Sequence, residues 1–368
     1  MRLAAGLLSW YDRHRRDLPW RRTSDPYKIW LSEVMLQQTR VETVLPFYSR
    51  FLERFPTVGD LARADIDEVL ALWSGLGYYR RARQLHAAAR KLAETGEFPN
   101  TLEGLLALPG IGAYTAAAVA SIAFGVAAPV MDGNVERLLS RYLALNDEPR
   151  AGASRRLLLA TAGDFLDSRR PGDSNQALME LGATLCTPRR PRCLLCPLHE
   201  DCRAAGEGNP ERYPVPKMKR SAERHRLLVA VVERGEKVLL FRRPDDRTLL
   251  AGTWELPWVT LERNGAPEPG PPEEALASRY GGVWTLGPQI GRARHGITYR
   301  DLEVAVHRAA LSWGGEVRES AAAGWFDEAG RARLPLSSLV GKALAALAGS
   351  GATLEEAESA RRSRIRRR

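Results

Sequence analysis

Residues 108–134 read LPGIGAYTAAAVASIAFGVAAPVMDGN, and the rest of the chain is interpreted outward from them. Gly110 and Gly112 flank one apolar residue, which predicts a tight turn whose backbone can be approached closely. The small, apolar run 115–124 then predicts a packed helix. Amides of such a turn can face a DNA phosphate much as a helix N-terminus holds an anion. This is the helix-hairpin-helix pattern, although taken alone it also fits a plain helix corner.

A carboxylate follows this hairpin at a fixed reach along the chain. Asp132 precedes Gly133 and Asn134 at the start of a predicted helix over 135–145, where aspartate is a favoured N-cap. The amides and the helix dipole favour the charged form, so we expect the pKa of Asp132 to be lowered. A plain cap without a chemical role is the alternative.

A second carboxylate lies on a helix predicted over 27–38, after the N-cap candidate Asp25. Glu33 shares its helical face with Ile29 and Trp30. A carboxylate on so apolar a face is desolvated, which raises its pKa, as a general acid working near neutral pH requires. A surface glutamate on a misjudged face is the alternative.

All four cysteines of the chain lie within one short segment. Disulfides are rare inside cells, so thiols this close together predict a metal site. Zinc and a [4Fe–4S] cluster both accept four cysteines, and the residues alone leave both open. His199 has workable spacing for a zinc ligand, although the cysteines already complete a set. The predicted ligands are Cys186, Cys193, Cys196 and Cys202.

The chain has 368 residues, 44% of them hydrophobic, which predicts two domains with substantial cores. The formal net charge of +10 favours a polyanionic partner such as nucleic acid. Residues 1–226 hold 33 Lys and Arg against 26 Asp and Glu, whereas residues 227–360 hold 15 against 18. The last eight residues add six arginines, so the first half and the tail are the basic parts.

The pattern of elements predicts a multidomain fold, all-α followed by α+β. Strand candidates are 227–233, 237–243, 253–259, 283–290 and 302–311, with a closing helix at 337–347. No signal peptide and no run of about 18 apolar residues is visible, so we expect a cytoplasmic protein without a membrane partner. The expected parts are a helical domain over 1–205, a linker over 206–226, an α+β domain over 227–350 and a basic, disordered tail over 351–368.

Several motifs, in order, resemble those of the MutY-type adenine DNA glycosylases of the endonuclease III superfamily. They are LPWR at 18–21, WLSEVMLQQT at 30–39, LGYY at 76–79, the hairpin, MDGNV at 131–135, NQALM at 175–179 and the cysteine loop. The resemblance covers nearly the whole chain. It implies a helix-hairpin-helix glycosylase domain whose cysteines hold a [4Fe–4S] cluster rather than zinc.

The resemblance implies a reaction on duplex DNA. Adenine opposite 8-oxoguanine or guanine would be flipped out and its N-glycosidic bond hydrolysed by a monomeric enzyme. Glu33 would protonate the adenine at N7 and later accept a proton from water. Asp132 would stabilise the oxocarbenium-like sugar, as one carboxylate does in glycoside hydrolases. Asn134 and Tyr114 match positions that orient these groups.

Other family positions imply contacts with DNA. Tyr78 and Gln38 match residues that wedge beside the lesion pair, and Gly110 and Gly112 match the phosphate-binding turn. Positions that match the adenine pocket are Arg16, Leu18, Trp20, Arg21 and Gln176, and Gln37 and Thr39 are further predicted substrate- or DNA-binding residues.

Tyr114 separates this chain from relatives that nick the backbone. Those relatives carry a lysine here, whose amine forms a Schiff base, and a phenol cannot do so. A bifunctional glycosylase and lyase of the endonuclease III type is therefore disfavoured. A DNA binder without catalysis would require Glu33 or Asp132 to be missing, and both are present.

The second half resembles the 8-oxoguanine-recognition domain of the same family, which is related to Nudix hydrolases. A working Nudix hydrolase needs an acidic helix of the form R-E-x-x-E-E, and residues 272–279 lack it, so a pyrophosphatase is disfavoured. Residues 294–299 align with the loop that contacts 8-oxoguanine. The family usually has Phe-Ser-His there, whereas this chain has Ile297-Thr298-Tyr299, which leaves Thr298 as the candidate hydroxyl.

Overall fold

The computed structural model describes residues 2–215, 221–244, 250–297, 299–312 and 322–348. The chain divides into two compact units. One comprises Met1–Ala64 and Gln84–Met218, and the other comprises Asp65–Arg83 and Lys219–Arg368. No helix in the described ranges is long and apolar enough to cross a membrane. The predicted order of an all-α part before an α+β part is confirmed.

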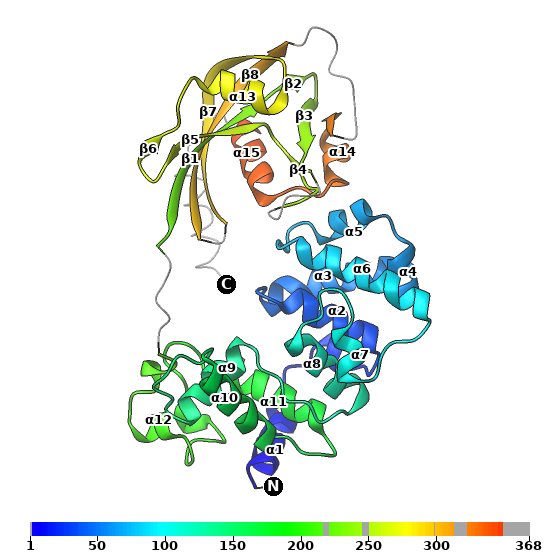
Figure 1. Ribbon diagram of the computed structural model, residues 1–368, viewed down its shortest axis with the longest axis vertical. Coiled ribbons are helices and arrows are strands. Elements are labelled where there is room, and N and C mark those ends of the chain that lie inside the picture. The colour runs from blue at the N-terminus through cyan, green and yellow to red at the C-terminus, as the bar shows by residue number, and fades with distance from the viewer. Residues whose placement is uncertain (1, 216–220, 245–249, 298, 313–321, 349–368) are drawn as a thin grey trace. The chain divides into compact units, whose positions relative to one another are not determined.

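The first unit is built from helices, and its described residues contain no strand (Figure 1). Helix α6 (Arg80–Thr95) begins in the segment assigned to the other unit. The remaining helices are α1 (Arg2–His14), α2 (Pro26–Leu36), α3 (Val41–Arg54), α4 (Val58–Arg63), α7 (Leu102–Leu106), α8 (Ala113–Phe124), α9 (Gly133–Tyr142), α10 (Gly152–Asp164), α11 (Pro171–Thr184) and α12 (Arg203–Gly206). Short 3-10 helices are η1 (Pro19–Arg21), η2 (Cys193–Leu195) and η3 (Pro210–Arg212).

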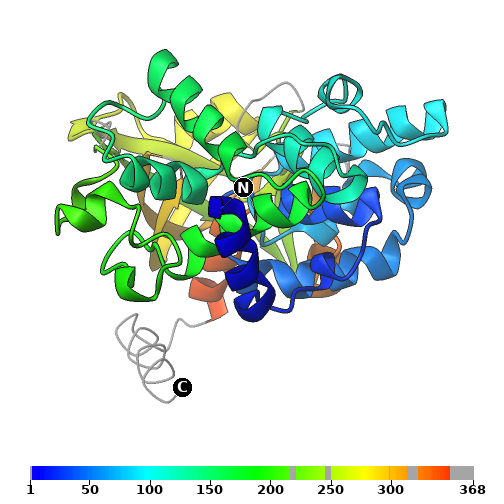
Figure 2. The ribbon, with the colours of Figure 1, turned by 90° about the horizontal axis from the view of Figure 1, so that it is seen from below.

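Helices from opposite ends of the first unit pack together. Figure 2 shows α1 beside α11, although they are far apart in sequence. Leu7 and Tyr11, one turn apart on α1, are fully buried in a cluster with Leu178 and Leu181 of α11. Burying one such apolar side chain contributes roughly 1.5–3 kcal/mol relative to leaving it exposed. This core holds α11 in position, and residues of the candidate site lie on this helix.

Helix α2 carries the first candidate carboxylate. The Asp25 side chain accepts hydrogen bonds from the amides of Tyr27 and Lys28, so the predicted cap is confirmed. The helix ends at Leu36 rather than at the predicted residue 38, because Gln38 has a φ of 59° and leaves the helical path. This early end separates the residues after Leu36 from the helix on which Glu33 lies.

The second unit contains two sheets, with β1, β8 and β7 side by side in Figure 1. The first sheet has the order β6-β5-β1-β8-β7, and in the second β3 pairs with β2, β4 and β9. The strands are β1 (Glu223–Val231), β2 (Glu233–Arg234), β3 (Lys237–Arg242), β4 (Trp254–Glu255), β5 (Trp258–Arg263), β6 (Ala266–Pro267), β7 (Val283–Ile297), β8 (Arg300–Ser312) and β9 (Ala323–Phe326). The helices are α5 (Ile66–Trp73), α13 (Pro272–Tyr280), α14 (Glu328–Ala332) and α15 (Ser338–Ala348).

Strand β1 is the centre of the first sheet and is buried on both faces. It pairs parallel with β8 and antiparallel with β5. Leu227 and Val229 belong to one core cluster, while Leu228 and Ala230 belong to the cluster on the opposite face. This explains the continuous apolar run over residues 227–231 of the strand.

Two strand predictions differ from the structure. The single strand expected over 227–233 is divided, because β1 stays in the first sheet while β2 forms the predicted hairpin with β3. The strand expected over 253–259 is also divided, into β4 and β5. Pro257 lies at the division, and a residue without an N–H cannot donate to a sheet ladder.

Candidate active site

Asp132 ends an extended segment and caps helix α9. Its Oδ1 accepts hydrogen bonds from the amides of Asn134 at 2.9 Å and Val135 at 2.7 Å. Its Oδ2 accepts another from the Asn134 side-chain amide at 3.0 Å. The Asp-Gly-Asn sequence therefore produces the predicted cap and also fixes the orientation of the carboxylate.

The expected lowering of the Asp132 pKa is wrong. Burial raises this pKa above its ordinary value, and it outweighs the lowering by the hydrogen bonds from Val135 and Asn134 and by the charge of Arg137. The local sequence correctly indicates the cap. The low polarity around the carboxylate comes from packing between helices, which the sequence near Asp132 does not reveal.

Glu33 lies on α2 with only 5% of its surface exposed. Burial raises its pKa to about 7, and the nearby charge of Asp132 adds to the rise. Hydrogen bonding from Tyr114 and the charge of Arg21 act in the opposite direction. The predicted rise is therefore confirmed, and its main cause is the predicted one.

Tyr114 lies in the first turn of α8, where the charges of both Glu33 and Asp132 act on its hydroxyl. Its hydroxyl donates a hydrogen bond to Glu33 Oε2 at 2.6 Å and lies 3.3 Å from Met179 Sδ. Burial and the charges of Glu33 and Asp132 raise the pKa of this phenol well above its ordinary value. Tyr114 therefore stays protonated and acts as a donor. The site combines a carboxyl that titrates near neutrality with a second, oriented carboxylate.

The hairpin before α8 adopts the predicted tight turn. Gly110 has a φ of 73°, and a Cβ there would lie 2.5 Å from Gln84 Cβ, so this position requires glycine. Gly112 has an ordinary φ of −92° and open space around it. It is the N-cap of α8 and supplies no side-chain cap, which leaves the first amides of the helix suited to an anion.

Two of the residues expected in an adenine pocket, Arg16 and Arg21, bind one buried glutamate that sequence reasoning missed. Glu180 on α11 binds Arg16 Nε at 2.8 Å and Arg21 Nη2 at 2.8 Å, and its side chain is fully buried. Burial alone would raise the pKa of Glu180, but the hydrogen bonds from Arg16 and Arg21 lower it to about 2. Glu180 lies one helical turn after Gln176. This spacing from a predicted pocket residue is the sequence signal that could have identified Glu180.

Leu18 and Trp20 flank these arginines near η1 and are both buried. The Trp20 ring packs edge-on against Tyr48, with centroids 5.3 Å apart. Gln176, from α11, is 9% exposed. These side chains form part of the packed surroundings of the site.

The stretch after α2 lies against the start of α8. Gln37 Nε2 donates to Thr115 Oγ1 at 3.1 Å, and Thr39 Oγ1 donates weakly to the Gln37 carbonyl at 3.4 Å. Gln38, between them, has the left-handed backbone already described. The structure thus places residues 37–39 together with the helix that carries Tyr114.

Two predicted DNA contacts belong to the second unit. Tyr78 has a φ of 50° and is 48% exposed, and the guanidinium of Arg81 lies 5.4 Å from its ring centroid. Thr298 lies outside the described residues.

Asn175 and Arg137 are further residues whose roles the sequence did not indicate. Asn175 is fully buried and holds the segment that leads to Asp132, because its Oδ1 accepts from the Val130 amide at 3.1 Å. Arg137 donates through Nη2 to Asn134 Oδ1 at 2.9 Å and through Nε to the Cys186 carbonyl at 2.8 Å. The cap of α9 is therefore connected to the cysteine loop.

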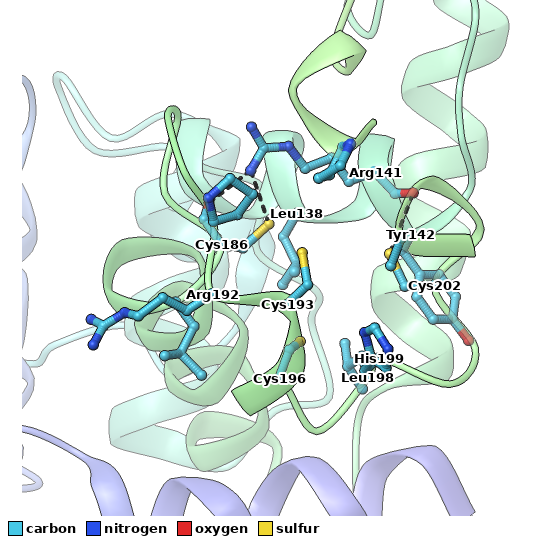
Figure 3. A pocket seen from close by; sticks show the side chains of 14 residues that line it. Leu138, Arg141, Tyr142, Cys186, Arg192, Cys193, Cys196, Leu198, His199 and Cys202 are labelled. Carbon is cyan, nitrogen blue, oxygen red and sulfur yellow. Dashed lines mark hydrogen bonds between the residues drawn. The ribbon is translucent and has the colours of Figure 1, made fainter. Parts of the chain in front are cut away.

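The four cysteines line one pocket (Figure 3). Buried Arg141 lines this pocket and holds the chain that follows Cys186, because it donates to the carbonyls of Thr187 at 2.7 Å and Pro188 at 2.9 Å. It also lies 3.3 Å from Cys186 Sγ. No three His, Cys, Asp or Glu side chains in the described part of the chain converge on the position of a single metal ion.

Burial raises the pKa of the Cys193, Cys196 and Cys202 thiols above its ordinary value. Burial and the neighbouring cysteines raise the pKa of Cys196 to about 12, although hydrogen bonding from the Leu198 amide lowers it. A cationic group that took these sulfurs as thiolates would therefore release protons. His199 also lines the pocket, and its buried Nδ1 has no hydrogen-bond partner among the described residues.

Comparison with known proteins covers both units. Residues 31–161 match the HhH-GPD superfamily of base excision DNA repair proteins, and residues 228–346 match the NUDIX domain. Among solved structures, a thermostable thymine-DNA glycosylase is 30% identical, with a TM-score of 0.51 over 55% of this chain and 95% of that one.

Curated relatives share longer segments. The adenine DNA glycosylase of Rattus norvegicus is 42% identical over 313 residues, which cover 70% of this chain and 60% of the rat protein. That of Schizosaccharomyces pombe is 35% identical over 328 residues, which cover 73% of this chain and 71% of the yeast protein. The match to the Arabidopsis thaliana protein covers 48% of its length. The chain thus spans about half to 60% of several curated relatives.

Proposed function

Because this chain belongs to the MutY-type adenine DNA glycosylase family, we propose that it excises adenine mispaired with 8-oxoguanine or guanine in duplex DNA. The observation that carries the proposal is the Glu33–Tyr114 hydrogen bond beside the oriented carboxylate of Asp132. A carboxyl with a pKa of about 7 is matched to proton transfer near neutral pH. The net charge of +10 supports a polyanionic substrate.

The proposed reaction begins with adenine flipped out of the duplex. Protonated Glu33 donates its proton to N7, which makes the base a better leaving group. As the glycosidic bond breaks, positive charge develops on the sugar, and the Asp132 carboxylate stabilises it. Water then adds to the sugar, with Glu33 accepting its proton. The hydrogen bonds that Asp132 accepts from Val135 and Asn134 favour its charged form, which suits it to be the anion of the pair.

We propose that the enzyme is monofunctional. Tyr114 provides a hydroxyl and not an amine at this position. The raised pKa of the phenol keeps it protonated, so it remains a hydrogen-bond donor. A Schiff base requires a nitrogen nucleophile. The product should therefore be an abasic site in an intact strand.

The cysteine pocket is proposed to hold a [4Fe–4S] cluster. Its ligands would be the four cysteines, and the lack of a convergent single-ion site among the described residues agrees with a larger group. Such a cluster, when bound, supplies four sulfur–iron crosslinks within the loop. Arg141 would orient this loop through its carbonyl contacts. Four irons per chain in anaerobically purified protein, with no stoichiometric zinc, would support the assignment, and the reverse would reject it.

We further propose that each part of the chain has its own function. Residues 1–205 would perform catalysis, 206–226 would link, and 227–350 would discriminate 8-oxoguanine from guanine, with Thr298 as the candidate hydroxyl. We propose that the protein acts as a monomer on DNA in the cytoplasm, associated with the nucleoid if the source is bacterial. Among the described residues the second unit provides no metal-holding acidic group of the kind a Nudix hydrolase uses.

The decisive experiment uses duplexes with adenine opposite 8-oxoguanine, guanine and thymine. Excision should occur opposite the first two and not opposite thymine, and the strand should break only after alkali. Glu33→Gln should abolish base release while lesion-duplex binding persists, because the fold and the hairpin are unchanged. Glu53→Gln, on the exposed surface of α3, is the matched control. Full activity of the Glu33→Gln variant would reject the proposed acid.

A further inference from the structure

Residues 65–83 pack as part of the second unit, although their sequence lies between helices of the first. The chain passes into the second unit after Ala64 and leaves it after Arg83. This segment contains α5 and a turn over residues 74–79, and it ends in the first turn of α6. It also carries Tyr78, the residue expected to wedge beside the mispair. The expected wedge is therefore part of the second unit and not of the unit that carries the two carboxylates.

The backbone at Tyr78 has a conformation that depends on its surroundings. Its φ of 50° lies in the left-handed region, which costs free energy for a residue with a Cβ. Gly75 and Gly77, just before it, have φ values of 106° and 69°. The Tyr78 side chain is half-exposed, so its own packing contributes little to holding this turn. Such a conformation persists only where neighbouring contacts maintain it.

Arg81 supplies contacts to both the backbone of the turn and the ring of Tyr78. Its Nη2 donates to the carbonyls of Leu76 and Gly77, both at 3.2 Å. Its guanidinium carbon lies 5.4 Å from the ring centroid of Trp73 and 5.4 Å from that of Tyr78. The side chain is buried, and burial lowers its pKa only to about 10, so it stays charged near neutral pH. Arg81 therefore couples the path of the turn to the position of the Tyr78 ring.

Tyr79 attaches the turn to the rest of the second unit. Its hydroxyl donates to the Leu336 carbonyl at 2.5 Å, and Ser74 Oγ donates to the same oxygen at 3.1 Å. A carbonyl oxygen has two lone pairs and can accept both bonds. Leu336 forms a parallel bridge with Trp254 of β4, so the acceptor is itself held by a sheet. Tyr79 is buried, which makes this attachment a shielded one.

Two further contacts join the ends of the segment to the second unit. Asp67, in the first turn of α5, binds Arg242 Nη2 at 2.9 Å. Arg83 Nη2 donates to the Ala251 carbonyl at 2.9 Å. The Asp67 side chain is 40% exposed, and exposed ion pairs contribute little. The buried bond of Tyr79 is therefore the contact whose loss should affect the turn most.

We propose that Tyr79 and Arg81 are positioning residues that hold Tyr78 in the conformation with which it enters the base stack. The inference rests on the proposed function, in which Tyr78 wedges beside the mispair. A side chain inserted between bases has to unstack them, and a wedge that is already held in place loses less freedom on binding than a mobile one. The second unit then contributes to mispair recognition through the Leu336 carbonyl.

The test measures the effect of Tyr79→Phe with and without the wedge. All proteins are full-length and carry Glu33→Gln, so adenine stays in place while binding is measured. Tyr79→Phe keeps the buried ring and removes only the hydroxyl. It should weaken binding to a duplex with adenine opposite 8-oxoguanine about three- to tenfold, the range for one hydrogen bond. In a Tyr78→Ala background the same change should have no further effect, because no wedge is left to position.

Fluorescence reports the wedge without any base release. A 2-aminopurine beside the mispair brightens when its neighbours unstack, and this increase should be smaller in Tyr79→Phe and in Arg81→Lys. Tyr27→Phe is the matched control, because Tyr27 is a buried tyrosine of the first unit whose hydroxyl donates to the Phe55 carbonyl at 2.9 Å. It loses the same kind of bond and should change neither binding nor fluorescence.

Equal losses from Tyr79→Phe with and without Tyr78 would overturn the proposal, because Tyr79 would then act without the wedge. A loss as large in Tyr27→Phe, or no fluorescence increase with Tyr78 present, would also overturn it. Should Tyr79→Phe fail to fold, Arg81→Lys, which keeps the charge but not the planar guanidinium, goes through the same cycle. Failure of the proposed function is distinct, since native Glu33 protein would then release no adenine while the fluorescence cycle still shows whether Tyr78 depends on Tyr79.

Discussion

Tyr114 donates a 2.6 Å hydrogen bond to Glu33, and this contact limits how far burial raises the pKa of the proposed general acid. Without it, burial and the charge of Asp132 would hold the Glu33 pKa still higher, since the Tyr114 hydrogen bond is the main lowering influence. The phenol thus has two effects. It orients the carboxyl and keeps its titration near neutral pH.

The rate of excision should depend on pH through Glu33. Glu33 must be protonated to act, so the single-turnover rate should fall as pH rises through about 7. Tyr114→Phe removes a lowering influence, which should move this alkaline limb to higher pH. Single-turnover rates from pH 5 to 9 measure the shift. An unchanged midpoint in the variant would show that Tyr114 does not tune the acid.

Glu33→Gln should stabilise the folded protein at alkaline pH. The folded-state pKa of Glu33 is raised from 4.5 to about 7, so the folded state favours the protonated carboxyl. That preference is fully present below the unfolded pKa and is lost as pH rises through 7. Charging the buried group then costs about 3 kcal/mol, at roughly 1.4 kcal/mol per pKa unit.

The measurement is the difference in thermal midpoint between Glu33→Gln and the native protein at pH 5 and pH 8. The gain should be larger at pH 8. Glu53→Gln, exposed on α3, should show no such difference. A gain of equal size at both pH values would contradict the assigned cause.

Much of this catalytic arrangement could be predicted from the sequence, because it depends on residues that are close together along the chain. The Asp132 cap follows from the Asp-Gly-Asn order, and the apolar face of Glu33 follows from helical spacing. The pKa of Asp132 was predicted with the wrong sign, because its burial comes from packing between distant helices. Glu180 was missed since Arg16 and Arg21 lie 164 and 159 positions away.

The same distinction applies to the second unit. Alternation predicted the strands, but not that β1 and β2 would join different sheets, because register depends on long-range pairing.

Glu180→Gln should destabilise the first unit. It leaves Arg21, whose side chain is 9% exposed, without its counter-charge, and breaking a buried pair in this way costs about 3–5 kcal/mol. The low pKa of Glu180, about 2, adds a pH signature. Its stabilising contribution is present above pH 4.5 and is lost as pH falls toward 2, so native and variant proteins should converge in acid.

Thermal unfolding across this pH range tests the Glu180 prediction. Asp17→Asn, which removes the surface pair of Asp17 with Arg22, is the control and should change little. If Glu180→Gln were as mild as Asp17→Asn at neutral pH, the buried cluster would not be a stabilising element.

Native protein should release adenine and leave an abasic strand that breaks only on heating or in alkali. Tyr114 offers no amine, so borohydride should trap no covalent adduct. Tyr114→Lys places an amine beside Glu33 and should gain some trapping and strand scission. Stoichiometric trapping by the native protein would reject the monofunctional assignment.

Thr298→Ala should reduce the preference for 8-oxoguanine over guanine opposite adenine. Residues 227–360 hold 18 acidic against 15 basic side chains, so their contribution should be selective contacts rather than bulk phosphate binding. Loss of one discriminating hydrogen bond costs about 1–3 kcal/mol, which should lower the ratio of single-turnover rates by fivefold or more. Both duplexes are measured at one salt concentration because phosphate contacts depend on salt. Thr285→Ala, exposed on β7, is the matched control. If the ratio were unchanged in Thr298→Ala, recognition would instead depend on Tyr78 and Gln38, and the role proposed for Thr298 would be withdrawn.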